Sequence, residues 1–114
     1  MNSYSFTVYG NPLPKERARV VNGHAYTPKR TEAWERAVAA EYRGPLFTGR
    51  LSLTVRFYRD SKRRVDTDNL VKGVMDSLNR TAWRDDCQIV ELHAFRYIDK
   101  RRPRLEVYIV ELPK

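Results

Sequence analysis

The chain is poor in the features that mark secreted and membrane proteins. Its 114 residues include one cysteine, Cys87, so no internal disulfide can form. No apolar run approaches the roughly 18–20 residues of a membrane-spanning helix. The first residues, MNSY, also lack the basic and apolar segments of a signal peptide. We therefore expect a cytoplasmic protein with no membrane partner.

The composition is that of a folded domain. The hydrophobic fraction is 41%, and the aromatic residues (2 Trp, 7 Tyr and 4 Phe) supply enough apolar area to argue against disorder. The length fits one domain by the usual prior of roughly 100–200 residues. We find no internal repeat or low-complexity tract, and we expect residues 1–114 to form a single domain.

Positive charge dominates. The chain has 22 Lys and Arg against 14 Asp and Glu, which gives a formal charge of +8. Such a surface favours an anionic partner, nucleic acid first. Charge alone is weak evidence, but the cations also cluster. The three clusters are Lys15 to Arg30, Arg56 to Arg64, and Arg96 to Arg104.

The aspartates are gathered rather than scattered. Five of the seven lie between residues 66 and 86 (Asp66, Asp68, Asp76, Asp85 and Asp86). A basic surface can hold phosphates, while grouped carboxylates can hold a hard cation such as Mg²⁺. This combination is what a metal-dependent nuclease needs.

The first half of the chain predicts a strand, a hairpin and a helix. Residues 3–9 alternate between apolar and polar, the period of a strand. Residues 17–27 read as a short hairpin whose turn is Asn22-Gly23. Thr27 is expected to cap a helix that starts at Pro28 and ends before Gly44-Pro45. Its expected apolar face consists of Trp34, Ala37, Val38 and Tyr42.

The second half predicts a strand, a helix and two more strands. Residues 51–58 alternate cleanly, residues 59–64 form a basic loop, and a helix is expected from about Thr67 to Asn79. Strands 89–98 and 105–112 are expected to be joined by a hairpin loop. Together these elements predict an α/β (α+β) fold, with a mixed, mostly antiparallel sheet packed by two helices.

The second helix carries two faces. At about 100° per residue, its apolar positions share one arc: Leu70, Val71, Val74, Met75 and Leu78. Asp68, Lys72 and Asp76 form a row on the other side, because their spacing is i, i+4, i+8. That row alone favours a solvated face with Asp–Lys pairs.

Asp66 changes the balance between these interpretations. Residues two apart in an extended segment point the same way, so Asp66 and Asp68 can face one site. One aspartate at a helix start is explained as a cap, but two, after four cations in seven residues, exceed that need. With the Asp85-Asp86 pair they could hold one or two ions against a phosphodiester, while a nearby lysine offsets developing charge.

Four ordered segments resemble the RusA family of Holliday junction resolvases. The first two are Pro14-Lys15-x-Arg17-x-Arg19 and Tyr26-Thr27-Pro28. The others are Asp66-Thr67-Asp68-Asn69-x-x-Lys72 with Asp76-x-Leu78, and Trp83-x-Asp85-Asp86-x-Gln88-Ile89. The likeness covers about residues 6 to 110. One departure is Ala18, where family members often have proline.

The resemblance implies an enzyme, a cofactor and a substrate. RusA-like proteins are Mg²⁺- or Mn²⁺-dependent homodimeric endonucleases that place paired, symmetric nicks across four-way DNA junctions in recombination and repair. It implies metal ligands at Asp66, Asp68 and Asp86 and a catalytic lysine at Lys72, with Asp76 and Asp85 as secondary acidic positions. The expected DNA contacts are Lys15, Arg17, Arg19, Lys62, Arg63, Arg64 and Asn69.

Two other functions stay open at this point. A non-enzymatic nucleic-acid-binding module explains the charge equally well but leaves the aspartates unexplained. A different nuclease class, with an acid-x-Lys motif, is spelled by Asp60-Ser61-Lys62, although these residues lie in a basic loop.

Overall fold

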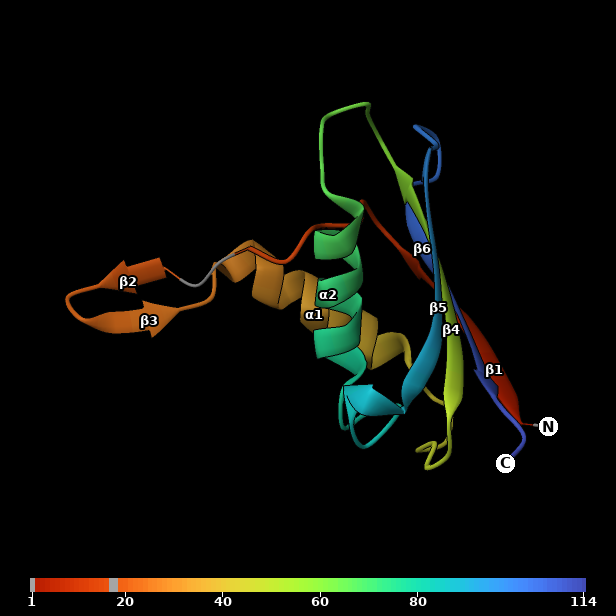
Figure 1. Cartoon of the computed structure of the whole chain (residues 1–114). Helices are drawn as coiled ribbons and strands as arrows, with labels where there is room; N and C mark the ends of the chain where they lie inside the picture. Colours follow the sequence, from red (N-terminus) through yellow and green to blue (C-terminus); the bar gives the residue numbers. More distant parts are fainter. Residues whose placement is uncertain (1, 17–18) are drawn as a thin grey trace.

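A computed structural model describes residues 2–16 and 19–114 (Figure 1). Six strands, two α-helices and a short 3₁₀ helix follow one another in these residues. In chain order they are β1 (Ser3–Tyr9), β2 (Arg19–Val21), β3 (His24–Tyr26), α1 (Lys29–Glu41), β4 (Leu51–Arg59), α2 (Thr67–Leu78), η1 (Asp86–Gln88), β5 (Ile89–Ile98) and β6 (Arg104–Glu111).

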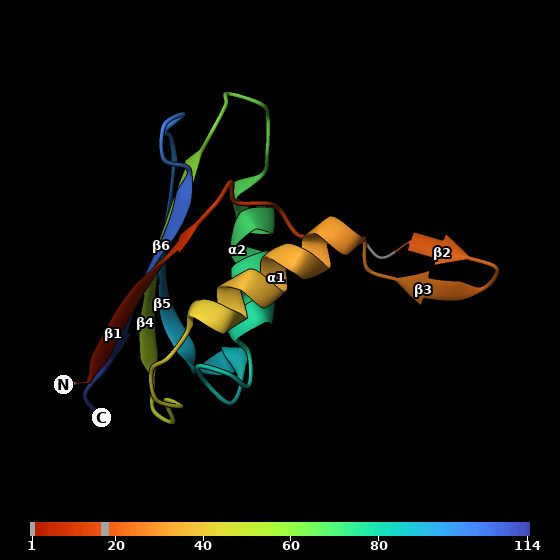
Figure 2. The same ribbon diagram turned by 180° about the vertical axis from the view of Figure 1, so that it is seen from behind.

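The main sheet has four strands in the order β1-β6-β4-β5. β6 is antiparallel to both β1 and β4, whereas β4 and β5 are parallel. Parallel neighbours need a crossover, and α2 supplies it between β4 and β5. Both helices cover the same face of the sheet (Figures 1 and 2). The predicted fold class, a mixed and mostly antiparallel sheet packed by two helices, is confirmed.

β4 is the central strand of the core. Its alternation is complete, since every second residue from Leu51 to Arg59 is buried. Val55 lies opposite Val107 of β6, and Leu53 lies opposite Ile109, so both strands turn the same apolar rows toward the helices. The period of two read from residues 51–58 therefore identified the buried face correctly.

The β2–β3 hairpin extends away from the sheet (Figures 1 and 2). Asn22 and Gly23 form its turn, with φ angles of 53° and 78°. Two positive φ angles define the turn type that Asn-Gly favours, which confirms the sequence prediction.

α1 begins one residue later than predicted. The carbonyl of Pro28 accepts the first helical hydrogen bond, from the backbone N–H of Glu32 at 3.1 Å, so Pro28 rather than Thr27 is the N-cap. The buried residues of α1 are Thr31, Trp34 and Val38. The expectation for Ala37 is wrong: it is exposed, because it lies about 100° around the helix from Val38.

α2 agrees closely with its prediction. It ends at Leu78, and four of the five expected apolar residues are buried; the fifth, Met75, is partly buried. The N-terminal segment before β2 lies against this helix, since the backbone N–H of Lys15 donates to the carbonyl of Asn69 at 2.9 Å.

β5 and β6 do not form the expected hairpin. β4 lies between them, so residues 99–103 cross over the end of β4, where the backbone N–H of Asp99 donates to the carbonyl of Arg59 at 2.8 Å. β5 is the sheet edge, and none of its ten residues is fully buried. Among the described residues, no helix is long and apolar enough to cross a membrane.

Candidate active site

Asp66 and Asp68 stand at the start of α2 with exposed side chains. Asp66 is the N-cap residue, and its carbonyl accepts from the N–H groups of Asn69 and Leu70, both at 3.2 Å. Its carboxylate makes no capping hydrogen bond. Within the described residues, Asp68 accepts a side-chain hydrogen bond only from the neighbouring N–H of Asn69, at 3.0 Å. Helix capping therefore does not use the Asp66 carboxylate, which remains able to bind a ligand.

Lys72 lies one helical turn after Asp68 and is exposed, as the i, i+4 spacing predicts. It makes no ion pair with any residue that the structure describes. Its ammonium group can therefore approach a phosphate bound beside Asp68 without first breaking a salt bridge.

Asp86 is oriented by a buried tryptophan. The indole Nε1 of Trp83 donates to Oδ1 of Asp86 at 2.8 Å, and Trp83 is fully buried in the core. This hydrogen bond fixes one carboxylate oxygen and leaves the other available. Such support is typical of a carboxylate that must be held in one orientation.

Asp85 has a structural role instead. Its carboxylate accepts from the backbone N–H of Cys87 at 2.9 Å, while the Gln88 side chain accepts from the N–H of Asp85 at 3.0 Å. These reciprocal bonds form the capping box of η1. The hydrogen bond from the Cys87 backbone holds the pKa of Asp85 below its ordinary value.

Asp76 and Lys15 are bound to each other. The ammonium of Lys15 lies 2.8 Å from Glu35 and 3.3 Å from Asp76. Burial alone would lower the pKa of Lys15, but its hydrogen bonds to Glu35 and Asp76 raise it above the usual value. This ion pair connects the N-terminal segment to both helices.

The structure does not gather the three predicted metal ligands. Asp66 and Asp68 flank the start of α2, whereas Asp86 follows its far end, and a helix of 12 residues is about 18 Å long. Within residues 2–16 and 19–114, no three His, Cys, Asp or Glu side chains form a group that could hold a metal ion.

The remaining predicted DNA contacts are distributed over three segments. Lys62, Arg63 and Arg64 are exposed in the loop between β4 and α2. Asn69 is half-buried in the first turn of α2. Arg19 begins β2, on the hairpin that extends from the body, and Arg17 lies outside the described residues.

Two further arginines lie beside this loop, and the sequence placed both only in basic clusters. Arg59 was expected in the loop but is the last residue of β4, and only 7% of it is exposed. The signal was present, because the alternation of Leu51 to Phe57 continues inward to residue 59. Arg96 of β5 donates to the carbonyl of Val65, the residue before Asp66. No sequence pattern links Arg96 to that loop.

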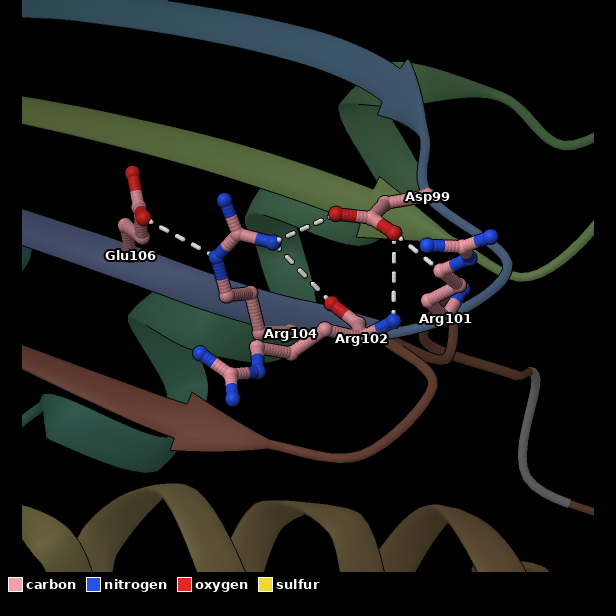
Figure 3. Close-up of polar contacts among 5 residues, drawn as sticks. All are labelled: Asp99, Arg101, Arg102, Arg104 and Glu106. Carbon is pink, nitrogen blue, oxygen red and sulfur yellow. Dashed lines mark hydrogen bonds and ion pairs between the residues drawn. The ribbon is translucent and has the colours of Figure 1, made fainter.

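Within the part of the chain that the structure describes, Arg104, unlike Arg59 and Arg96, is bound by carboxylates of the chain itself (Figure 3). Its guanidinium donates to Asp99 at 2.9 Å and to Glu106 at 3.0 Å, and also to the carbonyl of Arg102 at 3.0 Å. Asp99 in turn accepts from the N–H groups of Arg101 and Arg102, both at 3.1 Å. These bonds hold the connection between β5 and β6, so Arg104 is a structural residue.

Exposed carboxylates beside a basic loop are an arrangement typical of one class of protein, the enzymes that cut nucleic acid at phosphodiester bonds. The comparisons with known proteins give the family. Residues 9–110 match the family model described as endodeoxyribonuclease RusA, and the chain belongs to the RusA family of Holliday junction resolvases. It is also 31% identical to the uncharacterized protein YqaN of Bacillus subtilis (strain 168), over an alignment of 141 residues that covers 98% of this chain and 99% of the relative.

Proposed function

We propose that this protein resolves four-way DNA junctions by hydrolysing phosphodiesters in paired, symmetric nicks, as a homodimer that uses Mg²⁺ or Mn²⁺ in the cytoplasm. The observation that carries the proposal is the pair Asp66 and Asp68, two exposed carboxylates at the start of α2, next to an exposed run of cations and one turn before Lys72. Family membership supplies the kind of DNA.

The residues present fit a divalent ion of this kind. Mg²⁺ prefers one or two carboxylates, with waters and phosphate oxygens completing its shell. The carboxylate of Asp66 is free of the helix cap, and Asp68 has oxygen positions to spare beside its one backbone bond. A bound ion there supplies Lewis-acid stabilisation and lowers the pKa of a water nucleophile.

The surrounding cations have separate roles in the proposal. Lys72, on the same helix row as Asp68, offsets the negative charge that grows on the phosphate in the transition state. Lys62, Arg63 and Arg64 hold the backbone of the strand being cut. These phosphate contacts position the DNA without reading its sequence.

Asp86 is the third carboxylate of the proposed site. Because one described chain does not gather it with Asp66 and Asp68, the site closes either by movement of residues 79–88 or by use of Asp86 from a second copy. A complementation experiment separates these two routes. We expect Asp68→Asn and Asp86→Asn to be inactive alone.

Mixing the two inactive variants then gives opposite results for the two routes. If Asp86 acts in the other copy, a mixed dimer contains one intact site and nicks one strand of the junction. If Asp86 acts within its own chain, both sites of the mixed dimer are damaged and no nicks appear. Denaturing gels of end-labelled junction strands distinguish these outcomes.

The proposal as a whole is tested with a synthetic four-way junction. Incubation with Mg²⁺ or Mn²⁺ is expected to give paired nicks at symmetric positions, while a linear duplex of the same sequence remains intact. Asp68→Asn is the matched control, because it keeps the size of the side chain and removes its charge. Equal inactivity of wild type and variant over a range of metals and junction sequences would contradict the proposal.

A further inference from the structure

The strongest unassigned feature is a cavity at the edge of the sheet beside the basic loop. Its volume is about 280 Å³, several times the roughly 30 Å³ that one water occupies in the liquid. Four of its seven lining side chains are cations, and none is acidic: Arg59, Lys62, Arg63 and Arg96. The other lining residues are Ser61, Tyr97 and Ile98.

Arg59 is the buried part of this cavity. Its Nε donates to the carbonyl of Pro12 at 3.2 Å, and Nη1 donates to the carbonyl of Arg63 at 3.1 Å. It makes no ion pair with a carboxylate among the described residues. Burial lowers the pKa of Arg59, and although Asp60 acts in the opposite direction, Arg96 and Arg63 lower it further.

A buried cation without an anion is costly, and buried charges in proteins are generally paired. Here neighbouring cations add to the cost, because like charges in a partly desolvated space repel one another. The same arrangement binds an anion well: Arg59 and Arg96 present planar guanidinium groups, whose geometry matches phosphate oxygens.

The position of the cavity indicates which anion it takes. Arg96 donates to the carbonyl of Val65, which directly precedes the proposed metal ligand Asp66. In regular B-form DNA a strand carries one phosphate for roughly every 3.4 Å of helix axis, so a strand bound at Asp66 brings several phosphates close to the reacting one. A phosphate close to the reacting one is therefore placed near the mouth of the cavity.

We propose that this cavity is a phosphate pocket in which Arg59 and Arg96 bind a non-scissile backbone phosphate of the strand being cut. The inference rests on the proposed function, which it extends by adding two positioning residues. Binding one phosphate at a fixed distance from Asp66 places a nearby phosphate of the same strand at the carboxylates. It thus explains how sequence-independent contacts can set the position of the cut.

The test measures binding without metal, so that it does not depend on cleavage. Junction affinity is measured by fluorescence anisotropy in EDTA for wild type, Arg96→Gln and a control variant, Arg36→Gln. Arg36 is an exposed arginine of α1 that contacts only Glu32, at 3.7 Å, among the ion pairs described. We expect Arg96→Gln to weaken binding about tenfold and the control to change it little.

A scan of the DNA identifies the phosphate. Each junction in the series carries one neutral methylphosphonate, placed at successive positions of the strand. We expect one position, within a few nucleotides of the cut, at which this change weakens junction binding by wild type about tenfold. The same change should hardly affect binding by Arg96→Gln. Equal penalties for both proteins at every position would overturn the proposal, as would an Arg96→Gln variant that binds like Arg36→Gln.

Inorganic phosphate distinguishes DNA from a free anion as the natural occupant. It is expected to raise the unfolding temperature of wild type more than that of Arg96→Gln, because a ligand that binds only the folded state stabilises it. If phosphate stabilises the protein but no methylphosphonate position affects wild type more than Arg96→Gln, a DNA phosphate is not the occupant of the cavity, and the proposal is overturned. The absence of cleavage by wild type would overturn only the proposed function, because binding is measured separately.

Discussion

Two arginine clusters lie side by side at one end of the sheet and use their charges in opposite ways. At the connection between β5 and β6, Arg104 is bound by Asp99 and Glu106 (Figure 3). At the end of β4, Arg59 and Arg96 meet backbone carbonyls and further cations. The N–H of Asp99 donates to the carbonyl of Arg59, so the two clusters are direct neighbours.

The difference teaches how to separate structural from functional charge in a basic protein. A closed cluster satisfies its own charges, and its loss is expected to affect stability. An open cluster keeps charges that the chain does not neutralise, so an external ligand completes it. The aspartates divide in the same way: Asp85 caps η1, whereas the carboxylate of Asp66 is left out of the α2 cap.

The largest expected effect belongs to the open carboxylates. Asp66→Asn or Asp68→Asn should lower the cleavage rate by about 10³-fold or more, because loss of a metal ligand removes several kcal/mol of transition-state stabilisation. Junction binding should persist or tighten, since a negative charge near the phosphates is removed. Single-turnover cleavage and anisotropy measure the two quantities. Parallel loss of binding and cleavage would contradict this account, because it would show that the aspartates maintain the fold or the DNA-binding surface instead.

A second effect concerns the tryptophan that orients Asp86. Trp83→Phe removes the Nε1 donor at 2.8 Å and should lower cleavage about 10–100-fold, in the range typical of residues that support a metal ligand. Trp34→Phe is the matched control, because Trp34 is also buried and its Nε1 has no hydrogen-bond partner in the described part of the chain. A shifted Mg²⁺ dependence for Trp83→Phe alone would support a positioning role. Equal cleavage by the two variants would contradict it.

A third prediction compares one substitution in each of the two arginine clusters. Arg104→Gln breaks ion pairs with Asp99 and Glu106 and should lower the unfolding temperature by a few degrees while leaving junction affinity unchanged. Arg96→Gln should lower junction affinity while leaving the unfolding temperature nearly unchanged. Thermal unfolding and anisotropy on both proteins form a two-by-two test. The distinction between closed and open clusters would fail if both variants lost the same property.

The smallest effect is a dependence of stability on pH. The hydrogen bonds from Arg104, Arg102 and Arg101 hold the pKa of Asp99 below its ordinary value of 3.8. The carboxylate therefore contributes stability that is fully present above that value and is lost as the pH falls through its lower, folded-state pKa. Asp99→Asn should flatten the acid limb of the stability curve measured by denaturant unfolding. An unchanged slope below pH 3.8 would show that Asp99 contributes nothing there.

Local pattern was sufficient to predict most of the fold. The strands at residues 3–9 and 51–58 and the helix after Asp66 follow from periods of two and 3.6, which depend only on which face is buried. Asn22-Gly23 needs nothing beyond its own backbone preference. The prediction of a hairpin between β5 and β6 was wrong because strand pairing is decided by the whole sheet. β4 lies between these two strands and pairs with both of them.

The candidate site likewise contains residues whose placement follows from local pattern and residues whose neighbours come from distant segments. The placement of Asp66, Asp68 and Lys72 follows from helix geometry and agrees with the structure. The partners of Lys15 and the neighbours of Arg59 and Arg96 come from segments far apart in the chain, so no spacing rule could supply them. The roles of the three aspartates as metal ligands remain a prediction.

The central claim is that Asp66 and Asp68 hold the ion with which the enzyme cuts DNA. A crystal of the protein with a junction and Mn²⁺ tests it directly, because Mn²⁺ can be located by its anomalous scattering. We expect an anomalous peak within about 2.0–2.2 Å of carboxylate oxygens from both residues, close to hard-cation distances, and its disappearance in Asp68→Asn. A peak bound elsewhere, with Asp66 and Asp68 in contact only with water, would contradict the account.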